Sequence, residues 1–115
     1  MLKISTREES GAAIISVSGE VDLYSSPDFR TALLKMTEQK GAQIIVDLAD
    51  VPYMDSSGLA TLVEGYQKTT GNGGSLAIVN LQKGVREVFE LSNLDQIFDI
   101  FDTIADALGA NGAGN

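Results

Sequence analysis

The sequence contains no cysteine and no histidine. Without cysteine the chain cannot form a disulfide, a thiolate nucleophile or a thiolate metal site. Without histidine it cannot supply a Ser-His-Asp triad, an imidazole general base or the usual ligands of zinc. We therefore expect no catalytic residues, no metal site and no cofactor bound by the chain itself, and we predict that the protein is not an enzyme.

Basic residues are also few. Eight lysines and arginines stand against 16 aspartates and glutamates, which gives a formal net charge of −8. Such a charge repels nucleic acids and anionic membrane surfaces. No apolar run approaches the roughly 18 residues that a membrane-spanning helix needs, and the N-terminus lacks the apolar core of a signal peptide. The sequence predicts a cytoplasmic protein that binds neither nucleic acid nor membranes.

The length of 115 residues predicts a single domain. Low complexity is confined to the end of the chain, at residues 109–115. The small side chains of this segment bury too little apolar surface to offset the entropy lost on ordering. We predict a folded domain over residues 1–108 and a flexible C-terminal tail over residues 109–115.

The pattern of apolar residues predicts alternating strands and helices. Alternation predicts strands over 2–6 and 12–18, joined as a hairpin by a turn at 9–11. Ser26 is the expected cap of the first helix, with Gly41 after its end. The remaining expected elements are strands at 44–48, 76–79 and 97–101 and helices beginning near 56 and spanning 82–91 and 103–108.

The predicted order of elements is β-β-α-β-α-β-α-β-α. Strands that alternate with helices indicate a largely parallel sheet, because parallel neighbours need crossover connections. The opening hairpin makes the sheet mixed, so the predicted fold class is α/β. Binding sites in such sheets tend to lie at the carboxyl ends of strands and at the N-termini of the helices that follow.

Two hydroxyl groups, those of Ser56 and Ser57, lie at such a place. A serine at a helix N-terminus is most often a cap, which contributes about 1 kcal/mol, and local physics favours this interpretation. The same position suits phosphorylation, because free backbone N–H groups at a helix start stabilise a phosphate. The phosphate would add a charge of about −1.5 to −2 beside Asp55. We expect Ser57 to cap the helix and Ser56 to face outward.

The residues around these serines resemble those of a known family. Asp55-Ser56-Ser57-Gly58-Leu59, after an aliphatic strand and Val51-Pro52-Tyr53-Met54, resembles the signature of anti-sigma factor antagonists, which are small proteins built from one STAS domain. Gly19-Glu20-Val21-Asp22 is similar to the family's other short motif. The resemblance covers residues 1–108.

The resemblance implies a STAS-like mixed sheet with about four helices. It also implies that the unphosphorylated protein binds an anti-sigma factor that is a serine kinase, and so releases a sigma factor. Phosphorylation of Ser56 would end this binding, and a metal-dependent serine/threonine phosphatase would reverse it. ATP and magnesium would belong to the kinase. The implied partner-binding residues are Asp22, Asp55, Ser56, Ser57 and Gly58.

Other interpretations remain open at this point. Ser57 is an alternative phosphate acceptor, and Asp22 with Asp55 is an alternative metal pair, although two carboxylates alone do not make a specific site. A nucleophilic Ser56 needs a nearby base, and Lys68 lies about three helical turns away.

Two further alternatives concern the class of protein. A receiver domain needs an acidic pair after its first strand, where Thr6-Arg7-Glu8-Glu9 instead enters a turn. A STAS scaffold or regulatory subunit without a phosphoswitch, for example in a lipid-transport complex, shares the serine motif.

Overall fold

An antiparallel hairpin begins the chain. It consists of β1 (Lys3–Glu9) and β2 (Ala12–Ser18) in the computed structural model, which describes residues 2–113. Ser10 and Gly11 form a two-residue turn with positive φ angles of 52° and 83°. This turn type matches the right-handed twist of a hairpin. Because the turn is so short, β1 continues to Glu9 and does not end at Thr6 as expected.

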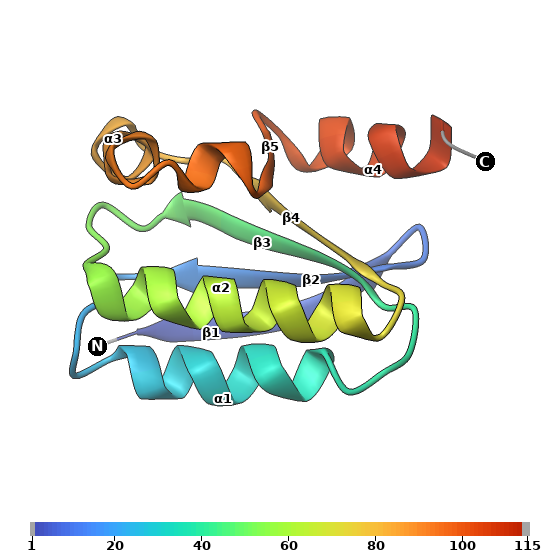
Figure 1. Cartoon of the computed structure of the whole chain (residues 1–115), viewed down its shortest axis with the longest axis horizontal. Coiled ribbons are helices and arrows are strands. Elements are labelled where there is room, and N and C mark those ends of the chain that lie inside the picture. The colour runs from blue at the N-terminus through green and yellow to red at the C-terminus, as the bar shows by residue number, and fades with distance from the viewer. Residues whose placement is uncertain (1, 114–115) are drawn as a thin grey trace.

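Three parallel strands extend the sheet beyond β2 (Figure 1). They are β3 (Gln43–Asp50), β4 (Ser75–Val79) and β5 (Asp99–Phe101), and the spatial order is β1-β2-β3-β4-β5. This arrangement confirms the predicted mixed α/β fold. The last strand is shorter than predicted because a 3-10 helix, η1 (Leu94–Gln96), precedes it and turns Phe98 into the core. Asn93 precedes η1 with a left-handed φ of 60°, a backbone conformation that asparagine adopts more readily than most residues.

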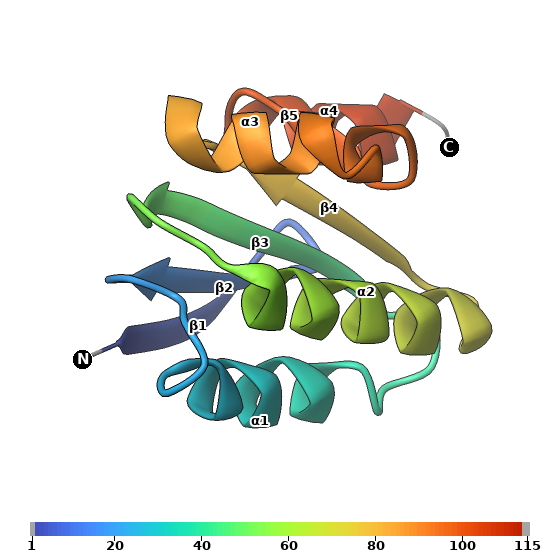
Figure 2. The same ribbon diagram turned by 60° about the vertical axis from the view of Figure 1, so that its left-hand side comes forward.

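Three helices connect the parallel strands. They are α1 (Ser26–Met36), α2 (Ser56–Gly71) and α3 (Lys83–Leu91). Right-handed crossovers that advance in one direction along a sheet place such helices on the same face, and Figure 2 shows α1 and α2 side by side there. Within the described residues, no helix combines the length and apolar character that crossing a membrane requires.

Both predicted ends of α1 are wrong. The N-cap is Ser25, because a turn at Asp22 already places the Ser26 backbone N–H on the Asp22 carbonyl at 2.8 Å. The helix ends at Met36 with Thr37 as C-cap, and the Thr37 hydroxyl donates to the Leu34 carbonyl at 2.7 Å. Gly41, the expected C-cap, has a φ of 69° in the loop that follows.

The last helix, α4 (Ile104–Ala113), is longer than the predicted 103–108. Residues 109–113 are therefore helical, although glycine and asparagine, which make up three of these five residues, favour a helix less than alanine does. Residues 114 and 115 lie outside the described residues, and the flexibility of the tail stays a prediction.

Alternate residues of the strands pack into two apolar cores, one on each face of the sheet. The face toward α1, α2 and α3 buries Ile15, Val46 and Ile78 against Phe29 and Phe89. The opposite face buries a smaller set against Ala107 of α4, namely Ala12, Ile14, Ile45, Ala77 and Val79. At about 25 cal/mol per Å² of apolar surface, this burial is the main stabilising contribution to the fold.

Close packing of α1 on α2 sets the positions of the two helix N-termini. A Cβ at Gly65 would lie 2.6 Å from Leu33 Cδ2, so only glycine allows this approach. On the surface Arg30 Nε and a second guanidinium nitrogen each bind Glu64 at 2.8 Å. Both helices start at the same end of the sheet, where the loops after β2 and β3 lie.

Candidate functional site

Two loops are joined by backbone hydrogen bonds at the carboxyl ends of β2 and β3, on the left in Figure 1. The Val21 N–H donates to the Tyr53 carbonyl at 3.0 Å, and the Asp55 N–H donates to the Val21 carbonyl at 3.0 Å. Val21 and Met54 form an isolated parallel bridge. The motif that ends at Asp22 and the motif that begins at Asp55 are therefore held side by side.

Asp55 is the N-cap of α2. Its carboxylate accepts the Ser57 backbone N–H at 2.9 Å and also the Ser57 hydroxyl. The expectation that Ser57 caps the helix is therefore wrong. The residue before the two serines has the extended backbone of a cap, with φ −99° and ψ −172°, and its side chain reaches the free N–H first.

The same hydrogen bonds favour the ionised form of Asp55. The Ser57 hydroxyl is the main cause, and the backbone N–H groups of Ser57, Gly58 and Leu23 add to it, so the pKa of Asp55 lies below its ordinary value of 3.8. Partial desolvation opposes this shift and is outweighed. A negative charge therefore sits at the start of α2 at neutral pH, where the helix dipole also favours it.

Replacing Asp55 by alanine is expected to lower the free energy of unfolding by about 1 kcal/mol, because one N-terminal N–H of α2 loses its acceptor. Asp55→Asn keeps a good cap without the charge and is the matched control. Because the folded-state pKa is lowered, the advantage of aspartate over asparagine is complete above 3.8 and declines as pH falls through the folded-state pKa. Urea unfolding from neutral to acidic pH measures it. An advantage that grows on acidification contradicts this assignment.

Ser56 occupies the first position of α2 and is exposed. Its hydroxyl makes no hydrogen bond to any group in the described part of the chain, whereas the Ser57 hydroxyl is occupied by Asp55. The outward orientation expected for Ser56 is confirmed. Of the two serines, Ser56 is the one whose hydroxyl is open to a modifying enzyme.

Gly58 is buried beneath this surface. A Cβ there would lie 2.5 Å from Met54 Cγ and 2.8 Å from Val21 Cγ1. The absence of a side chain lets the first turn of α2 rest on the bridge between the two loops. Gly58 therefore positions Ser56, and its own atoms are largely covered.

Asp22 organises the other loop. One oxygen of its carboxylate accepts the N–H groups of Tyr24 at 2.9 Å and Ser25 at 3.0 Å. The Ser25 hydroxyl accepts the Asp22 N–H and donates to the Glu20 carbonyl. Asp22 and Asp55 thus each bind backbone N–H groups, and residues 2–113 contain no group of three or more side chains suited to hold a metal ion.

Three large apolar side chains on these loops were not predicted from the sequence to belong to the site. The exposed fractions are 68% for Leu23, 91% for Tyr24 and 51% for Tyr53. They lie outside any strand or helix, so no periodicity marks them, but apolar residues between turn-forming residues are themselves a signal. We use the name loop face for the surface formed by Asp22, Leu23, Tyr24, Tyr53, Asp55 and Ser56.

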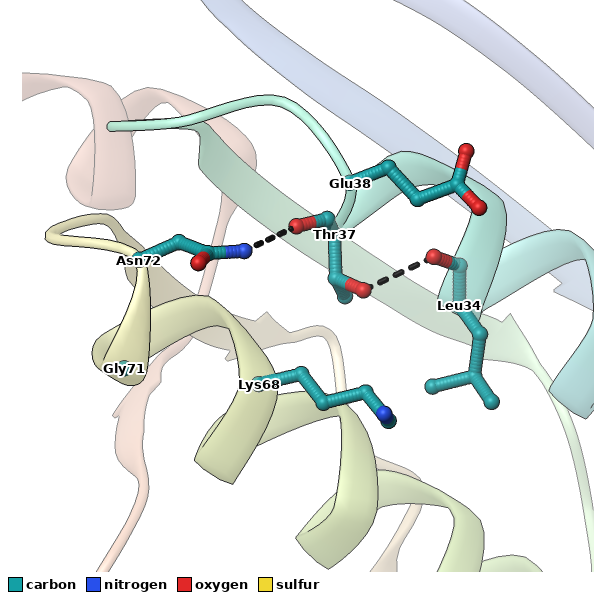
Figure 3. Close-up of a pocket in the computed structure, with 6 residues that line it drawn as sticks. All are labelled: Leu34, Thr37, Glu38, Lys68, Gly71 and Asn72. Atoms are coloured by element: carbon teal, nitrogen blue, oxygen red, sulfur yellow. Dashed lines mark hydrogen bonds between the residues drawn. The ribbon is translucent and has the colours of Figure 1, made fainter.

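A separate hollow of about 510 Å³ lies where α1 and α2 end, and Ser56 is at the other end of α2. Figure 3 shows the residues that line it. The Asn72 amide donates to the Thr37 carbonyl at 2.8 Å, and the Thr37 hydroxyl donates to Leu34. These bonds tie the two helix ends together. Thr37 and Asn72 thus have a structural role in this hollow, which the side chains of Glu38 and Lys68 also line.

Comparisons with known proteins agree with this geometry. The sequence profile of the STAS domain matches residues 3–107. The anti-sigma-B factor antagonist of Bacillus subtilis is 33% identical over 99 residues, covering 86% of this chain and 90% of the relative.

Solved structures with the same fold include an anti-sigma factor antagonist from Mycobacterium paratuberculosis. It is 27% identical, with a TM-score of 0.88 over 96% of this chain and 93% of the other. The Bacillus cell fate determinant SpoIIAA in its phosphorylated form is 21% identical, with a TM-score of 0.73 over 94% of this chain and 98% of the other.

Proposed function

The chain belongs to the STAS domain family, and from this premise we propose that it is an anti-sigma factor antagonist switched by phosphorylation of Ser56. The unphosphorylated loop face binds a cytoplasmic anti-sigma factor that is also a serine kinase, and the sigma factor is released. Relatives named as anti-sigma factor antagonists, such as that of Bacillus subtilis, support the first part. The phosphorylated SpoIIAA structure supports the second, as a modified example of this fold.

The observation that carries the proposal is the position of Ser56. Ser56 is exposed at the start of α2, next to the capping residue Asp55, on a loop that backbone hydrogen bonds join to the loop of Leu23 and Tyr24. A kinase reaches the Ser56 hydroxyl without unfolding any element. The helix cap is Asp55, so modification of Ser56 leaves the capping hydrogen bonds in place.

The charge introduced by the phosphate explains the loss of binding. A phosphoserine carries about −1.5 to −2 charges at neutral pH. It would stand next to the ionised Asp55, on a surface that already contains Asp22. Like charges brought together at an interface cost several kcal/mol. A single phosphate at the centre of the contact is therefore sufficient to separate the two proteins while the fold persists.

The chain supplies no catalysis of its own in this scheme. Ser56 has no histidine to activate it, since the sequence contains none. The kinase contributes ATP and magnesium, and a separate serine/threonine phosphatase removes the phosphate. The role of this protein is to present one hydroxyl and one binding surface to both enzymes.

The proposal is tested by incubating the protein with its anti-sigma kinase, ATP and magnesium, followed by mass spectrometry of the peptide around residue 56. We expect one phosphate, on Ser56, which persists in Ser57→Ala and is lost in Ser56→Ala. Phosphate on Ser57 would move the site. If no co-encoded kinase modifies the chain, the scaffold or regulatory-subunit interpretation replaces the phosphoswitch.

A further inference from the structure

The outer edge of β1 offers unpaired backbone groups. β1 is the first strand in the sheet order, and none of the described residues pairs with its outer side. The two-residue turn closes on the hydrogen-bonded pair Glu9 and Ala12. Because such pairs alternate along an antiparallel ladder, the odd-numbered residues of β1 bond to β2. The N–H and C=O groups of Ile4, Thr6 and Glu8 therefore point away from the sheet.

The side chains of β1 are self-complementary in one register. If a second β1 pairs antiparallel with Thr6 opposite Thr6, all seven residues of the strand are paired and Lys3 lies opposite Glu9 at both ends. If the pairing is centred on Ser5, Lys3 of one copy lies opposite Arg7 of the other. If it is centred on Arg7, the two Arg7 residues lie opposite each other. Opposite charges stabilise a cross-strand pair and like charges destabilise it. Of these three registers the charges favour the one centred on Thr6, in which Lys3 joins Glu9 beside the Arg7 guanidinium that already binds Glu9 at 3.2 Å within one chain.

An apolar groove runs beside the same edge. It has a volume of about 490 Å³ and is lined by Ile4 and Thr6 of β1 and by Ala32, Lys35 and Met36 of α1. Ile4, Ala32 and Met36 are only partly buried in the isolated chain. A strand added to β1 would be followed on the same face by its own α1, which would cover this groove.

From these features we propose that the edge of β1 is an interface for a second copy of this chain. The two β1 strands pair about a two-fold axis at Thr6. The five strands of each copy then form one continuous sheet of ten strands. Lys3 of each copy binds Glu9 of the other, and the two α1 helices lie on either side of the axis. The net charge of −8 on each copy opposes association and so raises the protein concentration at which the dimer forms.

This inference goes beyond the proposed function and does not depend on it. Antiparallel pairing directs the two loop faces to opposite ends of the dimer, because each loop face lies at the carboxyl ends of β2 and β3. Neither loop face is covered. Failure of the dimer would leave the phosphoswitch untouched, and failure of phosphorylation would leave the dimer untouched.

Sedimentation equilibrium of the full chain over a wide concentration range tests the proposal. We expect reversible dimers that Thr6→Pro abolishes, because proline removes an outward N–H and is tolerated on strand edges. Lys3→Glu is expected to weaken the dimer about tenfold, and adding Glu9→Lys to it to recover most of the loss. Lys83→Glu makes the same change of net charge on α3 and is the matched control.

Thermal unfolding of each variant at low concentration shows whether the monomer is intact. If Thr6→Pro fails to fold, the pair of charge variants decides the matter alone. A chain that stays monomeric at millimolar concentration overturns the proposal. So does a dimer that Lys3→Glu and Lys83→Glu weaken equally, since the effect would then reflect total charge and not the register at β1.

Discussion

Replacing Ser56 by aspartate is expected to lower the affinity for the anti-sigma factor by about 100-fold, while Ser56→Ala binds as the unmodified chain does. The expected cause is charge at the centre of the loop face, where the ionised Asp55 already stands. Like charges at an interface cost several kcal/mol, and each 1.4 kcal/mol is a factor of ten. Aspartate carries one charge, so it reproduces only part of the effect of a phosphate.

Isothermal titration calorimetry with the purified anti-sigma factor measures this difference. Ser56→Asn has the shape of the aspartate variant without its charge and is the matched control. Its affinity should stay close to that of Ser56→Ala. Equal affinities of the alanine and aspartate variants would show that residue 56 lies outside the contact, and the electrostatic mechanism would then be wrong.

Replacing Tyr24 by alanine is expected to weaken the same complex about 30-fold or more. Tyrosine is among the residues that most often dominate binding energy at interfaces, with losses of 2 kcal/mol or more on truncation. Tyr24 is 91% exposed in the free chain, so the substitution removes almost no internal packing. The free energy of unfolding should therefore stay within about 0.5 kcal/mol of the original value.

Leu91→Ala is the matched control for Tyr24→Ala. Leu91 is 86% exposed at the last position of α3, a helix that contributes no residue to the loop face. Truncating it removes a comparable exposed apolar side chain and should leave the affinity unchanged. If both variants bind as the original chain does, the apolar part of the loop face does not contact the anti-sigma factor.

The order of the elements could be predicted from the sequence because it depends on the spacing of apolar residues. The second strand, 12–18, has the predicted bounds, since both of its neighbours in the sheet restrict it. Helix ends were less predictable. The start of α2 depends on a side-chain hydrogen bond, in which Asp55 accepts the Ser57 N–H. The start of α1 depends on the backbone turn at Asp22, because Ser25 makes no side-chain cap bond.

The candidate site could be predicted in part for a similar reason. A serine after a strand and before a helix must lie at the carboxyl end of the sheet, which made the place of Ser56 predictable. The hydrogen bonds between Val21, Tyr53 and Asp55 join two loops far apart in the chain, and no local pattern encodes them. The exposure of Tyr24 follows from that loop geometry, so it was found only in the structure.

The two loops around Ser56 contain no lysine or arginine between residues 19 and 29 or between residues 50 and 58. Arg30, the next cation along the chain, is held by Glu64. These two loops therefore supply no guanidinium or ammonium group that could pair with a phosphoserine at position 56. Without such a pairing group in these loops, the lifetime of the phosphoserine would be set by the phosphatase that removes the phosphate. The phosphorylated fraction of the protein would then follow the relative activities of the kinase and the phosphatase.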